Sequence, residues 1–162
     1  MKNYSICFLA LYNRITHWTW SELLFGLRNN IIVIGDIKRY VDDVISKSDD
    51  EIDVMIQILI EENDEVESII QELALKERKQ DIDAIRSKWI FLIIYYYYLN
   101  NRINVHDIID EVYCDFDYPD DISTLVSYMP KEDGDSLEEK LVKYLKKSEE
   151  LWISDSSTVI SL

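Results

Sequence analysis

The sequence predicts an all-α protein, on the evidence of its composition, its hydrophobic periodicity and its helix-start signals. The 162 residues include only three Gly and two Pro, whereas strands need turns, and turns draw on these residues. Apolar residues recur at helical spacing along the chain, and residues that begin helices stand just before them. We therefore expect a single domain over residues 1–162, with about eight helices joined by short polar loops.

Five segments carry apolar residues with the i, i+3, i+4 spacing of one helix face. The stripes are Ile37, Tyr40, Val41, Val44 and Ile45; Ile52, Met55, Ile56, Leu59 and Ile60; Val66, Ile69, Ile70 and Leu73; Val105, Ile108, Ile109 and Val112; and Leu137, Leu141, Tyr144, Leu145, Leu151 and Trp152. Each stripe should face a core, with charged residues on the opposite face.

Start and stop signals divide the chain into helices. The capping-box pairs are Thr19 with Glu22, Ser48 with Glu51, and Ser136 with Glu139. Asn104 is a further candidate for the N-cap of a helix. Pro119 suits the first turn of a helix, and Pro130 suits the end of that helix. The expected helices are near 20–29, 36–46, 49–62, 64–77, 80–101, 105–114, 119–128 and 136–152. From about residue 154 the periodicity is lost, so we expect a frayed tail.

The segment 80–101 differs from the others because it is apolar on every side from Trp89 to Leu99. A helix of this kind is surrounded by its neighbours, so we expect it to be the central element. The residues expected to be most buried are Trp89, Ile90, Ile93, Ile94 and Tyr97. Its four consecutive tyrosines cannot form one flat stacking surface, because successive positions differ by about 100°. Core packing is therefore the favoured interpretation.

The net charge of −15, from 32 acidic against 17 basic residues, restricts the partners. It repels nucleic-acid backbones and anionic membrane surfaces. It attracts basic proteins, although an acid excess also serves solubility alone. Two isolated cysteines suit a reducing cytosol, and the apolar run 89–99 is too short to span a bilayer. We expect a cytoplasmic protein that binds neither nucleic acid nor membrane.

One acidic group raises an enzymatic alternative. Glu61, Glu62 and Glu65, read as Glu-Glu-x-x-Glu on one helix, resemble the first metal-binding half of the all-helical MazG-type nucleotide pyrophosphohydrolases, which hold magnesium. The second half, Glu-x-x-Asp on a following helix, is missing, so a solvated acidic face is the favoured interpretation. Zinc-ligand spacings, nucleophile motifs and phosphate-binding loops are absent from the sequence. We therefore predict no catalytic residue, metal or cofactor.

The run from 107 to 121 is the most unusual of the chain, since it holds seven acids and no Lys or Arg. The acids are Asp107, Asp110, Glu111, Asp115, Asp117, Asp120 and Asp121. Pro119 favours extended backbone at Tyr118. Asp115 and Asp117 should then point outward, with Phe116 and Tyr118 in the core. A helix-capping loop, a protein-binding surface and a metal site are all compatible with this pattern, although it lacks the Gly of a calcium loop.

Three segments carry a resemblance to a known family. They are the run Trp-Ser-Glu-Leu-Leu-Phe-Gly-Leu over 20–27, Lys88-Trp89, and the run Tyr-Cys-Asp-Phe-Asp-Tyr-Pro over 113–119 followed by Tyr128-Met129-Pro130. Over about residues 18–150 the chain resembles the bacterial family called domain of unknown function 2247. Cys114 stands where a small residue such as Ala is expected. The resemblance carries over no enzymatic activity, but it implies a suspected immunity protein of a polymorphic or contact-dependent toxin system.

The leading hypothesis from the sequence is thus an immunity protein that binds a basic toxin domain, such as a nuclease, in the cytoplasm. A magnesium-dependent hydrolase and a helical adaptor with another basic partner are the alternatives. The predicted partner-binding residues are Asp107, Asp110, Glu111, Asp117, Tyr118, Asp120, Asp121 and Tyr128. Tyr118 and Tyr128 serve as aromatic anchors if they are exposed.

Overall fold

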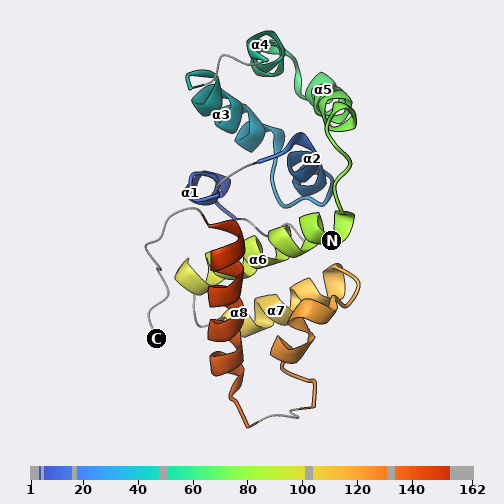
Figure 1. Ribbon diagram of the computed structural model, residues 1–162. Helices are drawn as coiled ribbons and strands as arrows, with labels where there is room; N and C mark the ends of the chain where they lie inside the picture. Colours follow the sequence, from blue (N-terminus) through green and yellow to red (C-terminus); the bar gives the residue numbers. More distant parts are fainter. Residues whose placement is uncertain are drawn as a thin grey trace. The chain divides into compact units, whose positions relative to one another are not determined.

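The computed structural model describes residues 4, 6–15, 18–47, 51–100, 104–130 and 134–153. These residues form α-helices and one 3₁₀-helix (Figure 1), and they contain no β-strand. Ile15 and Ile153 form an isolated antiparallel bridge. The all-α prediction is confirmed. Contacts between residues divide the chain into unit 1 (Met1–Asn13 and His17–Ile85) and unit 2 (Arg14–Thr16 and Arg86–Leu162); the single-domain expectation stays a prediction.

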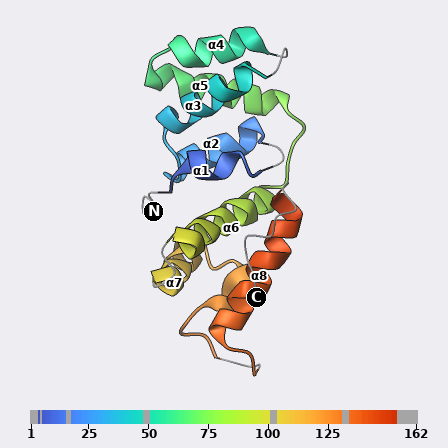
Figure 2. The same ribbon diagram turned by 90° about the vertical axis from the view of Figure 1, so that its left-hand side faces the viewer.

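The described residues of unit 1 form five complete helices and the first turn of α6 (Ile82–Asn100). The complete helices are α1 (Phe8–Tyr12), α2 (Trp20–Arg28), α3 (Ile34–Ile45), α4 (Ile52–Ile60) and α5 (Asn63–Lys76). Helix α2 packs against α5, and α3 packs against α1, α4 and α5, so α3, α4 and α5 are neighbours in Figure 2. Helix α1 was not predicted, because a helix of five residues is too short to show a periodic stripe.

The ends of α2 show how the sequence defines a helix. Thr19 Oγ1 accepts a hydrogen bond from the Glu22 amide at 3.2 Å, and the Thr19 amide donates to Glu22 Oε2 at 3.0 Å. The predicted capping box is therefore confirmed. At the other end Asn30 has a positive φ of 54°, and the Ile31 amide donates to the Gly26 carbonyl at 2.9 Å. This is the Schellman arrangement, here with Asn in the place where Gly is usual.

Helix α4 departs from its predicted stripe. Met55 and Ile58 are buried, whereas Ile56 is exposed and Ile60 has 74% of its surface exposed. The prediction is wrong for Ile56 and Ile60, because this short helix buries a narrow face spaced i, i+3 rather than a broad one. The capping residue expected before it, Ser48, lies outside the described residues.

Unit 2 contains most of α6 (Ile82–Asn100), α7 (Val105–Asp115), the 3₁₀-helix η2 (Asp120–Leu125) and α8 (Leu137–Trp152). Helix η2 packs against both α7 and α8. The capping box of Ser136 with Glu139 is confirmed at the start of α8, but Leu151, expected on its core stripe, is exposed.

The α-helix expected over 119–128 is wrong. Pro119 precedes η2 as its N-cap with extended backbone, and Val126, after the last residue of η2, is extended again. The segment therefore has no room for an α-helix reaching Pro130. The cap expected at Asn104 occupies the N-cap position of α7 but makes no side-chain hydrogen bond there.

Helix α6 has the burial that its apolar sequence predicts. Every side chain from Trp89 to Tyr95 is fully buried. Within unit 2, the Phe91 ring lies 5.2 Å from that of Tyr95 and 5.5 Å from that of Trp152, measured between centroids. The prediction for Tyr97 is wrong: this residue is only partly buried, whereas Tyr95 and Tyr98 are buried.

Two further expectations concern the membrane and the tail. No helix among the described residues has both the length and the apolarity that a transmembrane segment needs. The tail expected to fray from residue 154 lies outside the described part of the chain.

Replacing Ile93 with Ala should lower the free energy of unfolding by about 2–5 kcal/mol, because the Ile93 side chain is fully buried and its removal leaves a cavity. Ile60→Ala is the matched control, since Ile60 is 74% exposed and should change stability by less than about 0.5 kcal/mol. Urea denaturation followed by circular dichroism measures both. Equal effects of the two variants would contradict the observed burial.

Tyr40 makes the stability of unit 1 depend on alkaline pH. Burial, and then the charge of Glu22, raise the pKa of Tyr40 from 10.0 to about 12. The folded state therefore keeps a proton that the unfolded state releases, so this contribution is complete below pH 10 and is lost as the pH rises from 10 to about 12. We expect Tyr40→Phe to lose less stability than the unmodified protein across this range, measured by urea denaturation at successive pH values. Identical pH profiles would exclude this role.

Candidate functional site

The loop after α7 positions the residues predicted to bind a partner. Helix α7 ends with the 6→1 hydrogen bond of a Schellman arrangement, which the Tyr118 amide donates to the Tyr113 carbonyl at 2.8 Å, while the Phe116 amide closes the last ordinary turn by donating to the Val112 carbonyl at 3.0 Å. Asp117 has the left-handed backbone that this arrangement requires, with φ of 59°. The chain therefore reverses direction directly after the helix.

The extended geometry predicted for this loop is wrong. Tyr118 also has a positive φ, of 57°, although it precedes Pro119. The hydrogen bond of its amide to Tyr113 closes the helix end and outweighs the preference of residues before proline for extended backbone. As a result Phe116 is buried, as expected, but Tyr118 is 59% exposed rather than anchored in the core.

Two exposed tyrosines are held against a buried one. The rings of Tyr118 and Tyr128 lie edge-on to the ring of Tyr113, with centroid distances of 5.2 and 6.5 Å. Tyr113 is buried, whereas Tyr128 is 60% exposed. Cys114 Sγ lies 3.8 Å from the Tyr128 hydroxyl. Desolvation, followed by the Cys114 hydrogen bond and the charges nearby, raises the pKa of Tyr128 to about 12.

The predicted acids have different roles in the structure. The Asp110 carboxylate accepts hydrogen bonds from the Ser127 amide, at 2.9 Å, and from its hydroxyl. It therefore holds the segment that carries Tyr128. Asp117, Asp120 and Asp121 are exposed.

The remaining acids of the run lie on α7, and Asp115 among them was not predicted to bind a partner. Glu111 and Asp115 are partly buried and make further interactions, and Asp107 is in the first turn of α7, about 12 Å along the helix axis from Asp115. We use the name acidic tyrosine surface for Tyr118, Tyr128, Asp117, Asp120 and Asp121. No Lys or Arg occurs from 104 to 130.

The three glutamates of the enzymatic alternative do not share one helix. Glu61 follows the last residue of α4, Glu62 precedes the first residue of α5, and Glu65 lies in the first turn of α5. The prediction of Glu-Glu-x-x-Glu on a single helix is therefore wrong, because the chain bends between α4 and α5. The described residues contain no group of three His, Cys, Asp or Glu side chains arranged to hold a metal.

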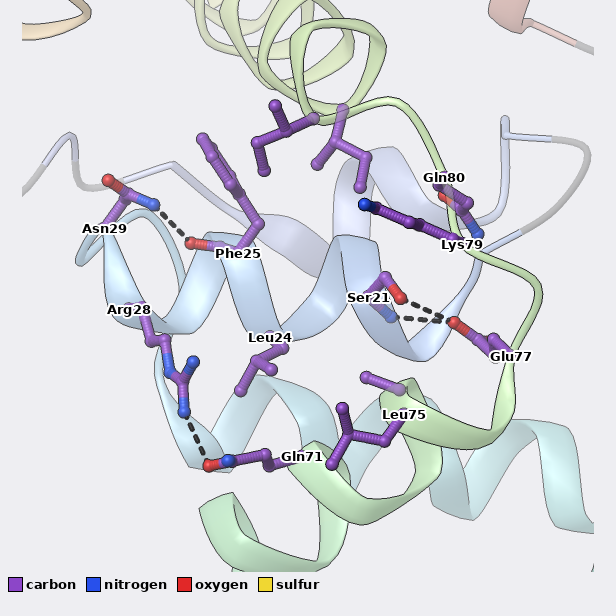
Figure 3. Close-up of a pocket in the computed structure, with 13 residues that line it drawn as sticks. Ser21, Leu24, Phe25, Arg28, Asn29, Gln71, Leu75, Glu77, Lys79 and Gln80 are labelled. Carbon is purple, nitrogen blue, oxygen red and sulfur yellow. Dashed lines mark hydrogen bonds between the residues drawn. The ribbon is translucent and has the colours of Figure 1, made fainter.

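Unit 1 contains a pocket of about 630 Å³ between α2 and α5, shown in Figure 3. Its wall is completed by the link 77–80 and by the start of α6. The lining residues are Ser21, Leu24, Phe25, Arg28, Asn29, Gln71, Ala74, Leu75, Glu77, Lys79, Gln80, Ile82 and Ile85. Six of the 13 lining residues are apolar, and the polar ones include an arginine and a lysine.

Glu77 connects the link to α2. Its carboxylate accepts hydrogen bonds from the Trp20 amide at 2.7 Å, and from the amide and the hydroxyl of Ser21 at 3.0 and 2.8 Å. These donors stand at the N-terminus of α2, where a negative charge is favourable. The contacts fix the link 77–80 against α2, and with it one side of the pocket.

This pocket was not predictable from the sequence patterns. The one feature of the sequence that could have indicated the pocket is Leu75, an apolar residue outside the apolar stripe of α5. In the structure this residue is 77% exposed. The other lining residues are brought together only by the packing of α2 against α5, which one sequence does not reveal.

The fold and the acidic tyrosine surface define an all-helical acidic protein with two exposed tyrosines beside exposed carboxylates. A comparison with protein families matches residues 9–156 to a family described as uncharacterized protein conserved in bacteria (DUF2247). The chain belongs to this family, as the resemblance in its sequence indicated. Neither the curated proteins nor the solved structures yield a match.

The left-handed backbone of Asp117 provides a test of the loop. Asp117→Gly should raise the free energy of unfolding by about 0.5 kcal/mol, because Gly adopts positive φ without steric cost, and Asp117→Ala should lower it by about 1 kcal/mol. Asp117→Asn, which removes the charge but tolerates this backbone, should change stability little. Thermal and urea denaturation measure all three variants. A stabilising Ala variant would mean that the loop does not have this geometry.

Proposed function

We propose that this chain is an immunity protein, which binds a cognate bacterial toxin domain in a stoichiometric complex and neutralises it. The observation that carries the proposal is the acidic tyrosine surface. Tyr118 and Tyr128 are each more than half exposed, and both are held in place against Tyr113.

Exposed tyrosines in fixed positions suit a protein interface. Tyrosine is enriched at the residues that dominate binding energy, since it buries a large area and has few rotatable bonds. The ring contacts with Tyr113 and the hydrogen bonds of Asp110 to Ser127 restrict this loop before a partner arrives. Less conformational entropy is then lost on binding.

The charge around the tyrosines defines the chemistry of the partner. Asp117, Asp120 and Asp121 lie next to Tyr118 in the sequence, and an arginine or lysine can pair with these carboxylates while it stacks on a tyrosine ring. The net charge of −15 steers a basic protein toward the chain and raises the association rate. A basic nuclease domain of a toxin is a partner of this kind.

The first experiment tests the function itself. The neighbouring genes are sequenced first. Where one of them encodes a large secreted protein, its C-terminal domain is expressed with and without the chain, and growth of the cells is followed. The proposal expects toxicity that the chain relieves, together with co-purification of the two proteins at equal stoichiometry. Binding without relief of toxicity would instead indicate a helical adaptor, and no binding would remove the immunity proposal.

The second experiment tests the surface. Replacing Asp117, Asp120 and Asp121 together with Asn should slow association with the toxin domain about tenfold or more at low salt and flatten the salt dependence of the rate. Asp110 is kept, because it holds Ser127. Stopped-flow or surface plasmon resonance measures the rates.

The control for this triple variant removes the same number of charges from unit 1, by Asp42→Asn, Asp53→Asn and Glu72→Gln, at three exposed positions. Equal rates for the two triple variants would place the contact elsewhere on the chain. Tyr118→Ala and Tyr128→Ala should mainly accelerate dissociation, since anchor residues act on the bound complex.

A further inference from the structure

We infer that the pocket of unit 1 binds a small amphipathic anion, a molecule with one carboxylate or sulfonate group on an apolar body. This site is separate from the acidic tyrosine surface, because all of its lining residues belong to unit 1. Its volume of about 630 Å³ lies within the usual range of small-molecule sites, which is about 300–1,000 Å³.

The apolar part of the wall provides the first argument. Leu24, Phe25, Ala74, Leu75, Ile82 and Ile85 line the pocket from three different helices. Leu75 is 77% exposed and Ile82 is 51% exposed, although both are large aliphatic residues on regular helices. A ligand body placed between them removes this apolar surface from water, which favours binding in proportion to the area covered.

The cations of the wall provide the second argument. Lys79 extends from the link toward the middle of the pocket in Figure 3. No carboxylate among the described residues pairs with its ammonium group. Arg28 lies on another side of the pocket, where its Nη2 donates to Gln71 at 2.7 Å and its Nε to Glu67 at 3.1 Å, and the guanidinium has further N–H donors.

The one acidic residue of the wall does not oppose an anion there. Glu77 directs its carboxylate to the N-terminus of α2, where it accepts the three hydrogen bonds from Trp20 and Ser21. Its charge is thereby offset by backbone donors and by the helix dipole. Lys79 remains as the unpaired charged group available to a ligand, whereas Arg28 is ion-paired with Glu67 and offers only its remaining N–H donors, in a chain whose net charge is −15.

This charge argues against the alternative occupants. A second copy of the chain, which carries the same net charge of −15, and an anionic membrane surface, which carries many charges, are repelled much more strongly than a small ligand with a single charge. A small anion with its charge at one end can place it beside Lys79 while its apolar body lies against Leu75 and Phe25. The pocket therefore suits a free small molecule rather than a macromolecular surface.

Binding is tested with anilinonaphthalene sulfonate, whose fluorescence rises in apolar sites, and with decanoate as competitor. The probe should bind the folded protein at one site, and decanoate should displace it. Decanol, which has the same chain without the charge, should displace it at least about tenfold more weakly, the effect expected from losing one charge-assisted contact. Circular dichroism confirms that the protein stays folded during the titration.

Two variants with matched controls locate the site. Lys79→Gln should weaken decanoate binding about tenfold, whereas Lys76→Gln, which removes an exposed lysine of α5 outside the pocket lining, should leave it unchanged. Leu75→Gln should weaken it about fivefold, whereas Ile60→Gln, at an equally exposed position of α4, should not. Both positions are exposed, so neither variant is expected to unfold the chain.

Several results would overturn the inference. Equal displacement by decanol and decanoate would remove the role of Lys79, and equal effects of a variant and its control would place the probe elsewhere. No saturable binding, or a dimer in light scattering that decanoate does not dissociate, would mean that the pocket does not take a small anion. Cosedimentation with neutral phosphatidylcholine vesicles that requires Leu75 would identify a lipid surface as the occupant and would also overturn it.

Discussion

Complete burial of one helical segment is the constraint on which unit 2 depends. From Trp89 to Tyr95 each side chain of α6 is shielded from water, although a helix on the surface of a protein buries only one face. No position in this run can carry a charge without a partner. Apolar side chains from the other helices must therefore cover it, as the contact of Phe91 with Trp152 shows.

Sequence patterns predicted those parts of the fold that local physics determines. The stripe of α7 at Val105, Ile108, Ile109 and Val112 is buried as expected, and the caps at Thr19 and Ser136 form as their residue types indicate. Patterns failed where a contact that residue spacing does not encode decides. Which face of α4 is buried depends on its packing against α3, and the geometry of Tyr118 depends on a helix-end hydrogen bond to Tyr113 that outweighs the preference of residues before proline.

The candidate surface was predictable in part for the same reason. The acidic run and the exposed tyrosines were visible as residue types, but the function of Asp110 was not. Its partner, Ser127, lies 17 residues further along the chain, beyond a 3₁₀-helix that the flanking Pro119 and Pro130 had indicated as an α-helix. Asp110 was predicted to contact a partner, but in the structure it holds Ser127, the residue next to Tyr128.

None of the described residues with a left-handed backbone is a glycine. Among the described residues, those with positive φ are Asn30, Glu51, Asp117 and Tyr118. Asn and Asp tolerate this conformation, whereas an aromatic residue adopts it at a steric cost. Two such residues are adjacent only at 117–118, within the acidic tyrosine surface. Strained backbone is concentrated at functional sites of proteins, and its place here agrees with the proposed role of the loop.

The cysteines of the chain also have a practical consequence. The sequence contains only Cys7 and Cys114, both are free and exposed, and one belongs to each unit. A pair of maleimide dyes can therefore be attached to the natural sequence, without introducing or removing any thiol. Energy transfer between the two dyes then reports the separation of the units in solution. Since Cys114 contacts Tyr128, the dye at that position also reports when a partner covers the acidic tyrosine surface.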